Sequence, residues 1–575
     1  MKLVAASDRS LIAYLGDEIG EESHARVVAL LRALERDRPA WLMNLHPGYG
    51  SLLVTFDPLT ITHREVEESI TRLERVAVAA PAAAPRTIEI PVCYGGEFGP
   101  DLEAVARAHA LTHERVCEIH AAEIYRAYFL GFAPGFAYLG DVPVAIATPR
   151  HATPRKSVPS GSVGIAGRQT GVYPFATPGG WQLIGRTPLA MFRADRAEMN
   201  LIALGDRVRF RAISRAEFDS LAAREAAAPA GGNFSAPARG ESSAPPPTRG
   251  ESSAALGAGA LRIEKPGMLT TVQDAGREGF GPLGVSPSGA ADSFSLEIGN
   301  RILGNPAGAA ALEFTLVGGT IAFPKGARIA LAGSDFGAAL SGPPLPCWEP
   351  REAAPGTVLE MGATRGGARC YLCVAGGVEV APVMGSASTH LLSGLGGFEG
   401  RALRKGDTLA MGAPPSAPRW ALAGRAALGA IAREAFDPPG ALKILRVTDG
   451  PQAARFSSRA WSTFLESAFT VSEDSNRMGL RLDGPMIATR DAGEMISEGV
   501  SLGAIQATPG GQPIVLFIEQ QTAGGYPKIA NVIAADLWRL GQLRPRDRVR
   551  FERVSVEDAL ERLREQRARL EGALE

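Results

Sequence analysis

A short sequence phrase occurs twice in this chain, once in each half. Residues 169–174 (QTGVYP) match residues 521–527 (QTAGGYP), and a second phrase follows each copy, GDRVRF at 205–210 and RDRVRF at 546–551. Short matches can arise by chance in a Gly-rich chain, but two matches in the same order argue against a chance origin. They predict two related β-rich modules that present the same kind of loop.

The length and charge of the chain limit its class. At 575 residues it is too long for one core, and about three or four domains are expected. Its 60 basic and 61 acidic residues give a formal charge of −1, which argues against a broad basic surface for nucleic acid or anionic lipid. No apolar run approaches the roughly 18–20 residues that span a bilayer, and the first residues do not resemble a secretory leader. Five cysteines do not form a disulfide framework. We therefore expect a soluble cytoplasmic protein.

A segment rich in Ala, Pro, Gly and Ser divides the chain between residues 223 and 260. Such a composition buries too little apolar surface to offset the entropy of ordering, so a flexible linker is expected there. The predicted fold class is mainly β with α+β. The predicted units are a small α/β domain (1–80), a β-barrel (86–222), the linker (223–260), two further barrel-like subdomains (261–440 and 441–555) and a C-terminal helix (556–575).

The N-terminal unit combines strand and helix patterns. Residues 11–15 and 51–56 are predicted strands, and residues 23–36 and 63–73 have the apolar spacing of amphipathic helices. This order is typical of a small ferredoxin-like α/β sandwich. The rest of the chain consists mostly of short apolar stretches punctuated by Gly and Pro, which is typical of β-barrels. Further helices are expected at residues 101–110, 112–125, 291–303 and 531–540.

Three loops carry residues suited to chemistry. Residues 129–140 combine Gly, Pro and aromatic side chains that can wall a pocket, and the alternative is a turn-rich corner with core aromatics. Residues 155–171 offer hydroxyl and basic side chains for a phosphate or carboxylate, and the alternative is a pair of β-turns. Lys528 follows a Gly-Gly-Tyr turn and can stabilise a phosphoryl group, although a solvated lysine is the commoner fate.

Metal and redox sites are not favoured. His109, His113 and Cys117 have helical spacing, but Thr112 is expected to start a new helix and so to separate His109 from the other two. Cys370 and Cys373 are three residues apart within a predicted strand, so their side chains point to opposite faces. No metal site is predicted.

The chain resembles a fusion of two protein families. Residues from about 1 to 220 are similar to the B subunit of 5-oxoprolinase, a family also named for KipI, an inhibitor of a sporulation histidine kinase. Residues from about 261 to 555 are similar to the C subunit of the same enzyme (KipA). This resemblance implies a cyclophilin-like β-barrel architecture throughout, preceded by the small α/β domain. The phrases that carry it are IPVCYGG (90–96), GFAPGF (131–136), the stretch 162–185, TVQD (271–274), AGGV (375–378), NRMG (476–479) and GGYPKIA (524–530).

The resemblance also implies an activity and a set of site residues. Relatives work with an A subunit of the LamB/YcsF type and open 5-oxo-L-proline to L-glutamate while consuming ATP, here expected with Mg²⁺. His120, which a core position would explain equally well, is the expected acid or base. The implied catalytic residues are His120, Asp292, Tyr526 and Lys528. The implied contacts to ATP or substrate are Arg155, Ser160, Ser162, Arg168, Gln169, Arg301 and Gln521.

Two other functions remain open. The same families resemble the carboxyltransferase domain of urea carboxylase, which moves CO2 from carboxybiotin to an amide nitrogen, but the chain has neither a Met-Lys-Met biotin attachment site nor an ATP-grasp domain. An allophanate hydrolase activity is disfavoured because no Gly-Gly-Ser-Ser-Gly amidase stretch occurs. A non-catalytic regulator of a histidine kinase is the third possibility. Fusion of the two halves argues for joint action, because a tether raises their effective concentration. We expect the barrels to meet face to face around one anion-accepting cleft.

Overall fold

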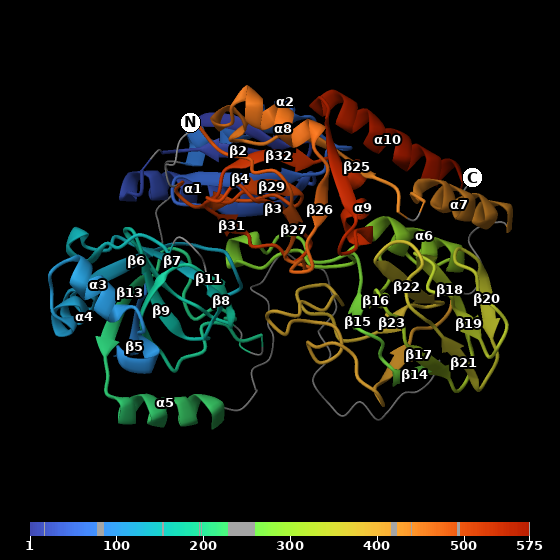
Figure 1. Cartoon of the computed structure of the whole chain (residues 1–575), viewed down its shortest axis with the longest axis horizontal. Coiled ribbons are helices and arrows are strands. Elements are labelled where there is room, and N and C mark those ends of the chain that lie inside the picture. The colour runs from blue at the N-terminus through green and yellow to red at the C-terminus, as the bar shows by residue number, and fades with distance from the viewer. Residues whose placement is uncertain are drawn as a thin grey trace.

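The computed structural model describes residues 1–16, 18–77, 85–151, 155–194, 196, 198–227, 259–415, 422–438, 440–490 and 495–573. In Figure 1 the N-terminal unit (blue) lies against the C-terminal barrel (orange to red), with the first barrel (cyan) and the middle unit (green to yellow) below them. Within the described residues, no helix combines the length and apolar character needed to cross a membrane. The predicted linker lies mainly outside the described residues, and helix α5 (Arg215–Ala227) extends into its first part.

The N-terminal unit is a four-stranded antiparallel sheet in the order β1-β2-β4-β3, covered by two helices. Both expected strands and both expected helices are present, but two further strands change the expected order to strand-strand-helix-strand-strand-helix. The missed strands, β1 and β3, lack a clear alternation of apolar and polar residues. The apolar stripe of the first helix packs on the sheet through Val27, Leu30 and Leu34. The elements are β1 (Lys2–Ser7), β2 (Ser10–Tyr14), α1 (Glu21–Asp37), β3 (Leu42–Pro47), β4 (Ser51–Phe56) and α2 (His63–Ala77).

The next unit is a closed barrel of seven strands in the order β10-β7-β6-β13-β5-β12-β9. Thr112 starts a helix as expected, since its side chain accepts a hydrogen bond from the Arg115 N–H at 3.2 Å. Its elements are β5 (Thr87–Tyr94), η1 (Gly96–Phe98), α3 (Leu102–Ala108), α4 (His113–Ala122), β6 (Ile124–Leu130), β7 (Ala137–Gly140), η2 (Val144–Ile146), β8 (Arg155–Val158), β9 (Ser162–Ala166), β10 (Gln169–Val172), β11 (Thr177–Gly179), β12 (Gln182–Arg186) and β13 (Arg207–Ala212).

The middle unit corrects a second expectation, because it is not a closed barrel. Its strands form a six-stranded and a five-stranded sheet that share one apolar core, as in a β-sandwich. Helix α6 begins two residues later than expected, because Asp292 caps it by accepting the Ser295 N–H at 2.8 Å. The elements are β14 (Ala260–Lys265), β15 (Thr270–Gln273), η3 (Gly281–Leu283), α6 (Ser293–Leu303), β16 (Ala311–Thr315), β17 (Thr320–Phe323), β18 (Ala327–Gly333), β19 (Ala339–Leu340), β20 (Pro350–Ala353), β21 (Thr357–Glu360), β22 (Arg369–Val374), β23 (Val378–Glu379) and β24 (Thr408–Met411).

The last unit is a second closed barrel of seven strands, in the order β25-β32-β29-β30-β27-β26-β33. The helix expected at 531–540 is instead the end of a strand followed by two short helical turns. The elements are α7 (Leu422–Ala435), β25 (Lys443–Asp449), η4 (Ala453–Arg455), α8 (Ser458–Glu466), β26 (Phe469–Val471), β27 (Gly479–Asp483), β28 (Glu498–Gly499), β29 (Ala504–Ala507), β30 (Pro513–Leu516), β31 (Ala523–Gly524), β32 (Lys528–Val532), η5 (Ala534–Asp536), α9 (Leu537–Gln542), β33 (Arg548–Arg553) and α10 (Val556–Gly572).

The repeated closing phrase has the same structural role in both barrels. It forms β13 in the first barrel and β33 in the second, and each pairs in parallel with the opening strand of its own barrel, β5 or β25. The phenylalanine of each copy, Phe210 or Phe551, is buried in the barrel core. The prediction of two related β-rich modules is therefore confirmed.

The N-terminal unit packs against the second barrel, which belongs to the other half of the chain. Oδ2 of Asp8 accepts the backbone N–H of Ala534 at 2.7 Å. The hydroxyl of Tyr14 donates to Oε2 of Glu498 at 2.9 Å. The two halves of the chain therefore contact each other directly, in addition to being joined through the linker.

Candidate functional site

A cavity of about 770 Å³ lies at the seam between the two closed barrels. Tyr173, from the first copy of the repeated phrase, lines it together with Gln521 and residues 523–527 of the second copy. Its volume is in the range of small-molecule sites. The two copies of the repeated phrase, one in each barrel, therefore both contribute to the lining of one cavity.

The wall contributed by the first barrel is aromatic. Phe132, Phe136, Tyr138, Tyr173 and Trp181 line it, and the rings of Phe136 and Trp181 meet edge to face with centroids 5.3 Å apart. All except Phe132 are buried. Burial raises the pKa of Tyr138 to about 12, so its phenol is neutral. This wall can hold a planar apolar group by stacking and dispersion.

Positive charge gathers in the same cavity. Arg150 comes from the first half, and Arg481 and Arg490 come from the second barrel. Within the described ranges, none of these three guanidinium groups makes a hydrogen bond or an ion pair. Asp474, whose side chain is exposed, is the one carboxylate among the described lining residues. The cavity therefore favours an anion, because guanidinium groups bind carboxylate and phosphate oxygens through charge-assisted hydrogen bonds.

The second-barrel loop approaches the first half closely at Gly525. A Cβ on Gly525 would stand 3.0 Å from the carbonyl oxygen of Met495 and 3.3 Å from Nη1 of Arg150. A Cβ on Gly524 would stand 2.5 Å from Nε2 of Gln521. A side chain at Gly525 would require Arg150 or the Met495 carbonyl to shift, and a side chain at Gly524 would displace the amide of Gln521.

One side-chain amide of the cavity lining has an N–H donor that no described residue satisfies. Gln506 is buried, and its Nε2 has no hydrogen-bond acceptor among the described residues. Its Oε1 lies 3.5 Å from Nε2 of Gln521, and both side chains line the cavity. An unpaired buried donor is costly, so an acceptor atom of a bound ligand would be stabilised here.

The family of the chain follows from two comparisons. The models "Carboxyltransferase domain, subdomain C and D" and "Carboxyltransferase domain, subdomain A and B" match residues 1–202 and 283–553. The 5-oxoprolinase B subunit of Bacillus subtilis is 44% identical over 225 residues, which cover 37% of this chain and 92% of that protein. The 5-oxoprolinase C subunit of Escherichia coli is 38% identical over 313 residues, which cover 53% of this chain and 95% of that protein. The chain belongs to the family of 5-oxoprolinase B and C subunits.

A solved structure shares both halves in one chain. The crystal structure of TTHA0988 is 34% identical, with a TM-score of 0.77, and the match covers 95% of this chain and all of that one. Part of the chain is also homologous to a segment of urea amidolyase. The likeness to TTHA0988 shows that the fold described here, with a B-like and a C-like half, has an experimental counterpart.

Of the predicted site residues, Gln521 and Tyr526 line the seam cavity, and both belong to the C-like half. Lys528 is two residues further on but buried, with its Nζ paired to Oε1 of Glu498 at 2.6 Å. Arg301 lies on α6 and pairs with Glu297. Neither Lys528 nor Arg301 is among the residues that line the cavity.

His120 and Asp292 are also buried away from the cavity. The two ring nitrogens of His120 contact the hydroxyls of Tyr94 at 2.8 Å and Thr170 at 3.0 Å. Burial lowers the pKa of His120 to about 3. Asp292 caps α6, accepts the side-chain amide of Gln542 at 2.6 Å, and has its pKa raised by burial to about 6. These contacts give both residues a structural role.

The predicted anion loop of the B-like half does not reach the cavity either. Arg155 donates to Oδ1 of Asp101 at 2.6 Å, and the hydroxyl of Ser160 donates to a backbone carbonyl. Ser162 and Gln169 are buried in barrel strands, and Arg168 is exposed, 3.5 Å from a carboxylate oxygen of Asp141. The loop therefore lies apart from the seam cavity, and its role in anion binding stays a prediction.

Sequence reasoning missed the cations of the site. Arg150, Arg481 and Arg490 lie outside the Gly-rich phrases, and nothing in their local sequence distinguishes them from solvated arginines. His151 and Trp181 were also missed. The ring of His151 lines the cavity with its Nε2 3.3 Å from Oδ2 of Asp101. Trp181 could have been chosen from the sequence, because it lies inside one of the family phrases and follows Gly179 and Gly180, which also line the cavity.

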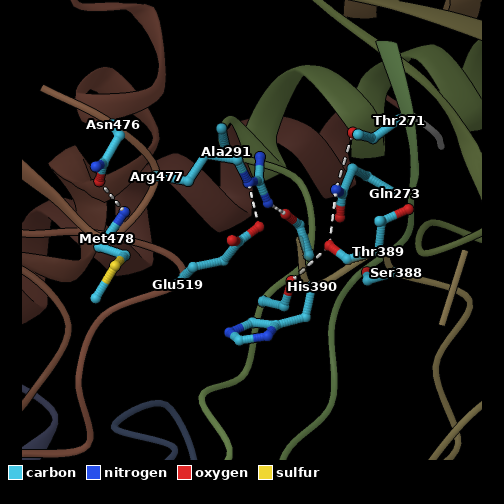
Figure 2. A network of polar contacts seen from close by, with 12 residues as sticks. Thr271, Gln273, Ala291, Ser388, Thr389, His390, Asn476, Arg477, Met478 and Glu519 are labelled. Carbon is cyan, nitrogen blue, oxygen red and sulfur yellow. Dashed lines mark hydrogen bonds and ion pairs between the residues drawn. The ribbon is translucent and has the colours of Figure 1, made fainter. Parts of the chain in front are cut away.

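A buried polar network fixes the loop that carries Asn476 and Met478, both of which line the cavity. Figure 2 shows Arg477, between them, extending in the other direction toward Ala291 and Glu519. Arg477 binds the carboxylates of Glu313 and Glu519 and donates to the carbonyl of Gly289 at 2.6 Å. Because the central residue is anchored in the middle unit, its two neighbours are held at the cavity wall.

Proposed function

We propose that this chain is the B and C component of an ATP-dependent 5-oxoprolinase, which opens 5-oxo-L-proline to L-glutamate together with a partner protein of the LamB/YcsF type. The homology to both subunits supports the complex. The observation that carries the proposal is the seam cavity, lined by both halves, in which Arg150, Arg481 and Arg490 have no partner among the described residues.

The proposed chemistry needs an anion site because a lactam is a poor electrophile. Transfer of the γ-phosphoryl group of ATP to the lactam carbonyl oxygen, with ADP leaving, converts that oxygen into a leaving group. Water then adds to the same carbon, and the ring C–N bond breaks with protonation of nitrogen to leave an acyl phosphate. A second water hydrolyses this acyl phosphate to the carboxylate of L-glutamate and inorganic phosphate. Positive groups placed around the phosphoryl oxygens stabilise such a transfer.

The residues of the cavity suit ATP. The three arginines can bind phosphate oxygens, Gly524 and Gly525 line the same cavity, and the aromatic wall of the B-like half can stack on the base. Asp474 is the described carboxylate at hand for Mg²⁺, whose other ligands would be phosphate oxygens and water. Each half would therefore supply a different part of the nucleotide site.

The test combines the purified chain with a LamB/YcsF-type partner protein, ATP and 5-oxo-L-proline. We expect ADP and L-glutamate to form in equal amounts, and only when all four are present. The Arg481→Gln substitution should raise the KM for ATP about tenfold or more, because a charge-assisted hydrogen bond contributes about 1.5–3 kcal/mol. ATP consumption that is indifferent to 5-oxo-L-proline would contradict the proposal.

A carboxyltransferase is the second candidate, favoured by the names of the two matching domain models and by the homology to urea amidolyase. The same preparation supplied with carboxybiotin and urea separates the two functions. Carboxylation of urea without ATP consumption would replace the first proposal. Silence in both assays would favour a non-catalytic regulator.

A further inference from the structure

A second cavity, of about 260 Å³, lies between the C-terminal helix α10 and the second barrel. It shares no lining residue with the seam cavity. Its floor contains Phe294 from α6 and Trp538 from α9, whose rings stack with centroids 5.0 Å apart. Its rim contains arginines from β25, α9 and α10.

Most charges around this second cavity are already paired. Asp536 is buried and pairs with Arg446 at 3.1 Å and Arg539 at 3.5 Å. On the rim, Arg569 of α10 pairs with Glu434 of α7 at 2.7 Å. These ion pairs connect the helices around the cavity to the barrel. Because the charges of all five residues are already paired, none of them is free to bind a ligand.

Two hydrogen-bond donors of residues that line the second cavity have no acceptor among the residues that the structure describes. The guanidinium of Arg562 makes no hydrogen bond or ion pair with any described residue, and its Nε is buried. The indole N–H of Trp538, a residue that is 5% exposed, is likewise buried and unpaired. Glu565, one helical turn from Arg562, is exposed and lies beyond ion-pair distance. Both residues line the second cavity, and a buried donor without an acceptor costs free energy that a bound acceptor would recover.

We propose that this second cavity binds a small oxyanion, a carboxylate or a phosphate, between Arg562 and Trp538. Arg562 supplies the charge-assisted donor and the Trp538 indole supplies the second, while the stacked rings form an apolar floor. The cavity is too small for a nucleotide and sized for a compact anion. Because α10 begins at Val556, beyond residues 283–553 that the subdomain A and B model matches, Arg562 lies outside the matched domain and Trp538 lies within it. Binding would fasten α10 to the second barrel.

The test measures binding of inorganic phosphate, and in a parallel arm succinate, to the full chain by titration calorimetry. We expect affinity at this site to fall at least tenfold in Arg562→Gln and to stay unchanged in Arg564→Gln, an exposed arginine of α10 that does not line the cavity. Trp538→Phe keeps an aromatic ring, although a smaller one, but removes the N–H, and should weaken binding less than Arg562→Gln.

The seam cavity also favours anions, so Arg481→Gln serves as the second control. Binding that survives Arg481→Gln and is lost in Arg562→Gln places the oxyanion beneath α10. Binding that is equal in wild-type and Arg562→Gln chains, or no binding of either anion once the seam site is removed, overturns the inference. The titration requires no catalysis, so it is independent of the proposed 5-oxoprolinase activity.

Discussion

The Nζ atom of Lys528 lies 2.6 Å from Oε1 of Glu498, and both side chains are buried. The other carboxylate oxygen accepts the hydroxyl of Tyr14 at 2.9 Å, and the amide of Gln452 donates to Oε1 at 2.8 Å. This cluster joins barrel strand β32, and strand β28 of the small two-stranded sheet beside the barrel, to the N-terminal unit. It assigns Lys528 to the interface between the two halves of the chain, close to the seam cavity but outside its lining.

Replacing Lys528 by methionine should lower the free energy of unfolding by about 3–5 kcal/mol, because Glu498 would be left buried without its cation. The double substitution Lys528→Met with Glu498→Gln removes both charges and should recover part of that loss. Urea denaturation of the three chains provides the measurement. A Lys528→Met chain that keeps full stability but loses ATP-dependent turnover would return Lys528 to the catalytic role predicted from sequence.

Arg481→Gln should raise the KM for ATP about tenfold or more while leaving stability unchanged, because Arg481 lines the seam cavity and its guanidinium pairs with no described residue. Arg459→Gln is the matched control, since Arg459 is exposed on α8 of the same barrel and lies outside the cavity. Steady-state kinetics with the reconstituted complex measure the KM for ATP of each variant. Equal effects of the two substitutions would argue against nucleotide binding at the seam.

His120 should make the chain less stable in acid. Burial lowers its pKa from 6.5 to about 3, so below pH 6.5 the unfolded chain binds a proton that the folded chain does not. The stabilisation is complete above pH 6.5 and is lost as the pH falls toward 3, by about 1.4 kcal/mol for each pH unit.

His120→Gln removes this titration while keeping a polar side chain in place. The difference in unfolding free energy between the wild-type and variant chains should therefore shift by about 1.4 kcal/mol per pH unit between pH 6 and pH 4. Denaturation curves at several pH values give this slope. A difference that does not change with pH would show that His120 titrates normally in the folded chain.

The two halves should associate when they are produced separately as residues 1–227 and 259–575. Asp8, whose carboxylate accepts the Ala534 N–H at 2.7 Å, lies at their interface. Asp8→Ala leaves that buried N–H unpaired, which costs about 1–3 kcal/mol, so association should weaken roughly 5- to 150-fold. Glu68→Ala, an exposed position on α2, is the control. Calorimetric titration of one half into the other measures the effect.

Local sequence patterns predicted several elements well. The helix cap at Thr112, the strand 51–56 and the C-terminal helix depend on interactions between near neighbours in the chain, which a short segment already contains. The middle unit was predicted less well. Whether its strands close into a barrel depends on hydrogen bonds between sheet edges, and these edges are distant in sequence.

The candidate site shows the same division. Gln521 and Tyr526 could be chosen because a Gly-rich turn is a local signal. His120 has the residue type of an acid–base catalyst, yet the structure encloses it between two hydroxyls and a phenylalanine ring. Burial, which sets its pKa, is a property of the packed barrel, and no local pattern reveals it.

The sequence by itself determined that two related modules are present, because each copy of the DRVRF phrase carries the alternation that makes a strand with one buried face. Only the tertiary structure decided where the modules meet. Arg150 and Gly525 belong to opposite halves of the chain and touch because the N-terminal unit packs on the second barrel and brings the first barrel beside it. A cavity at such a seam is formed by contacts between distant segments, so its cations have no signature in the sequence around them.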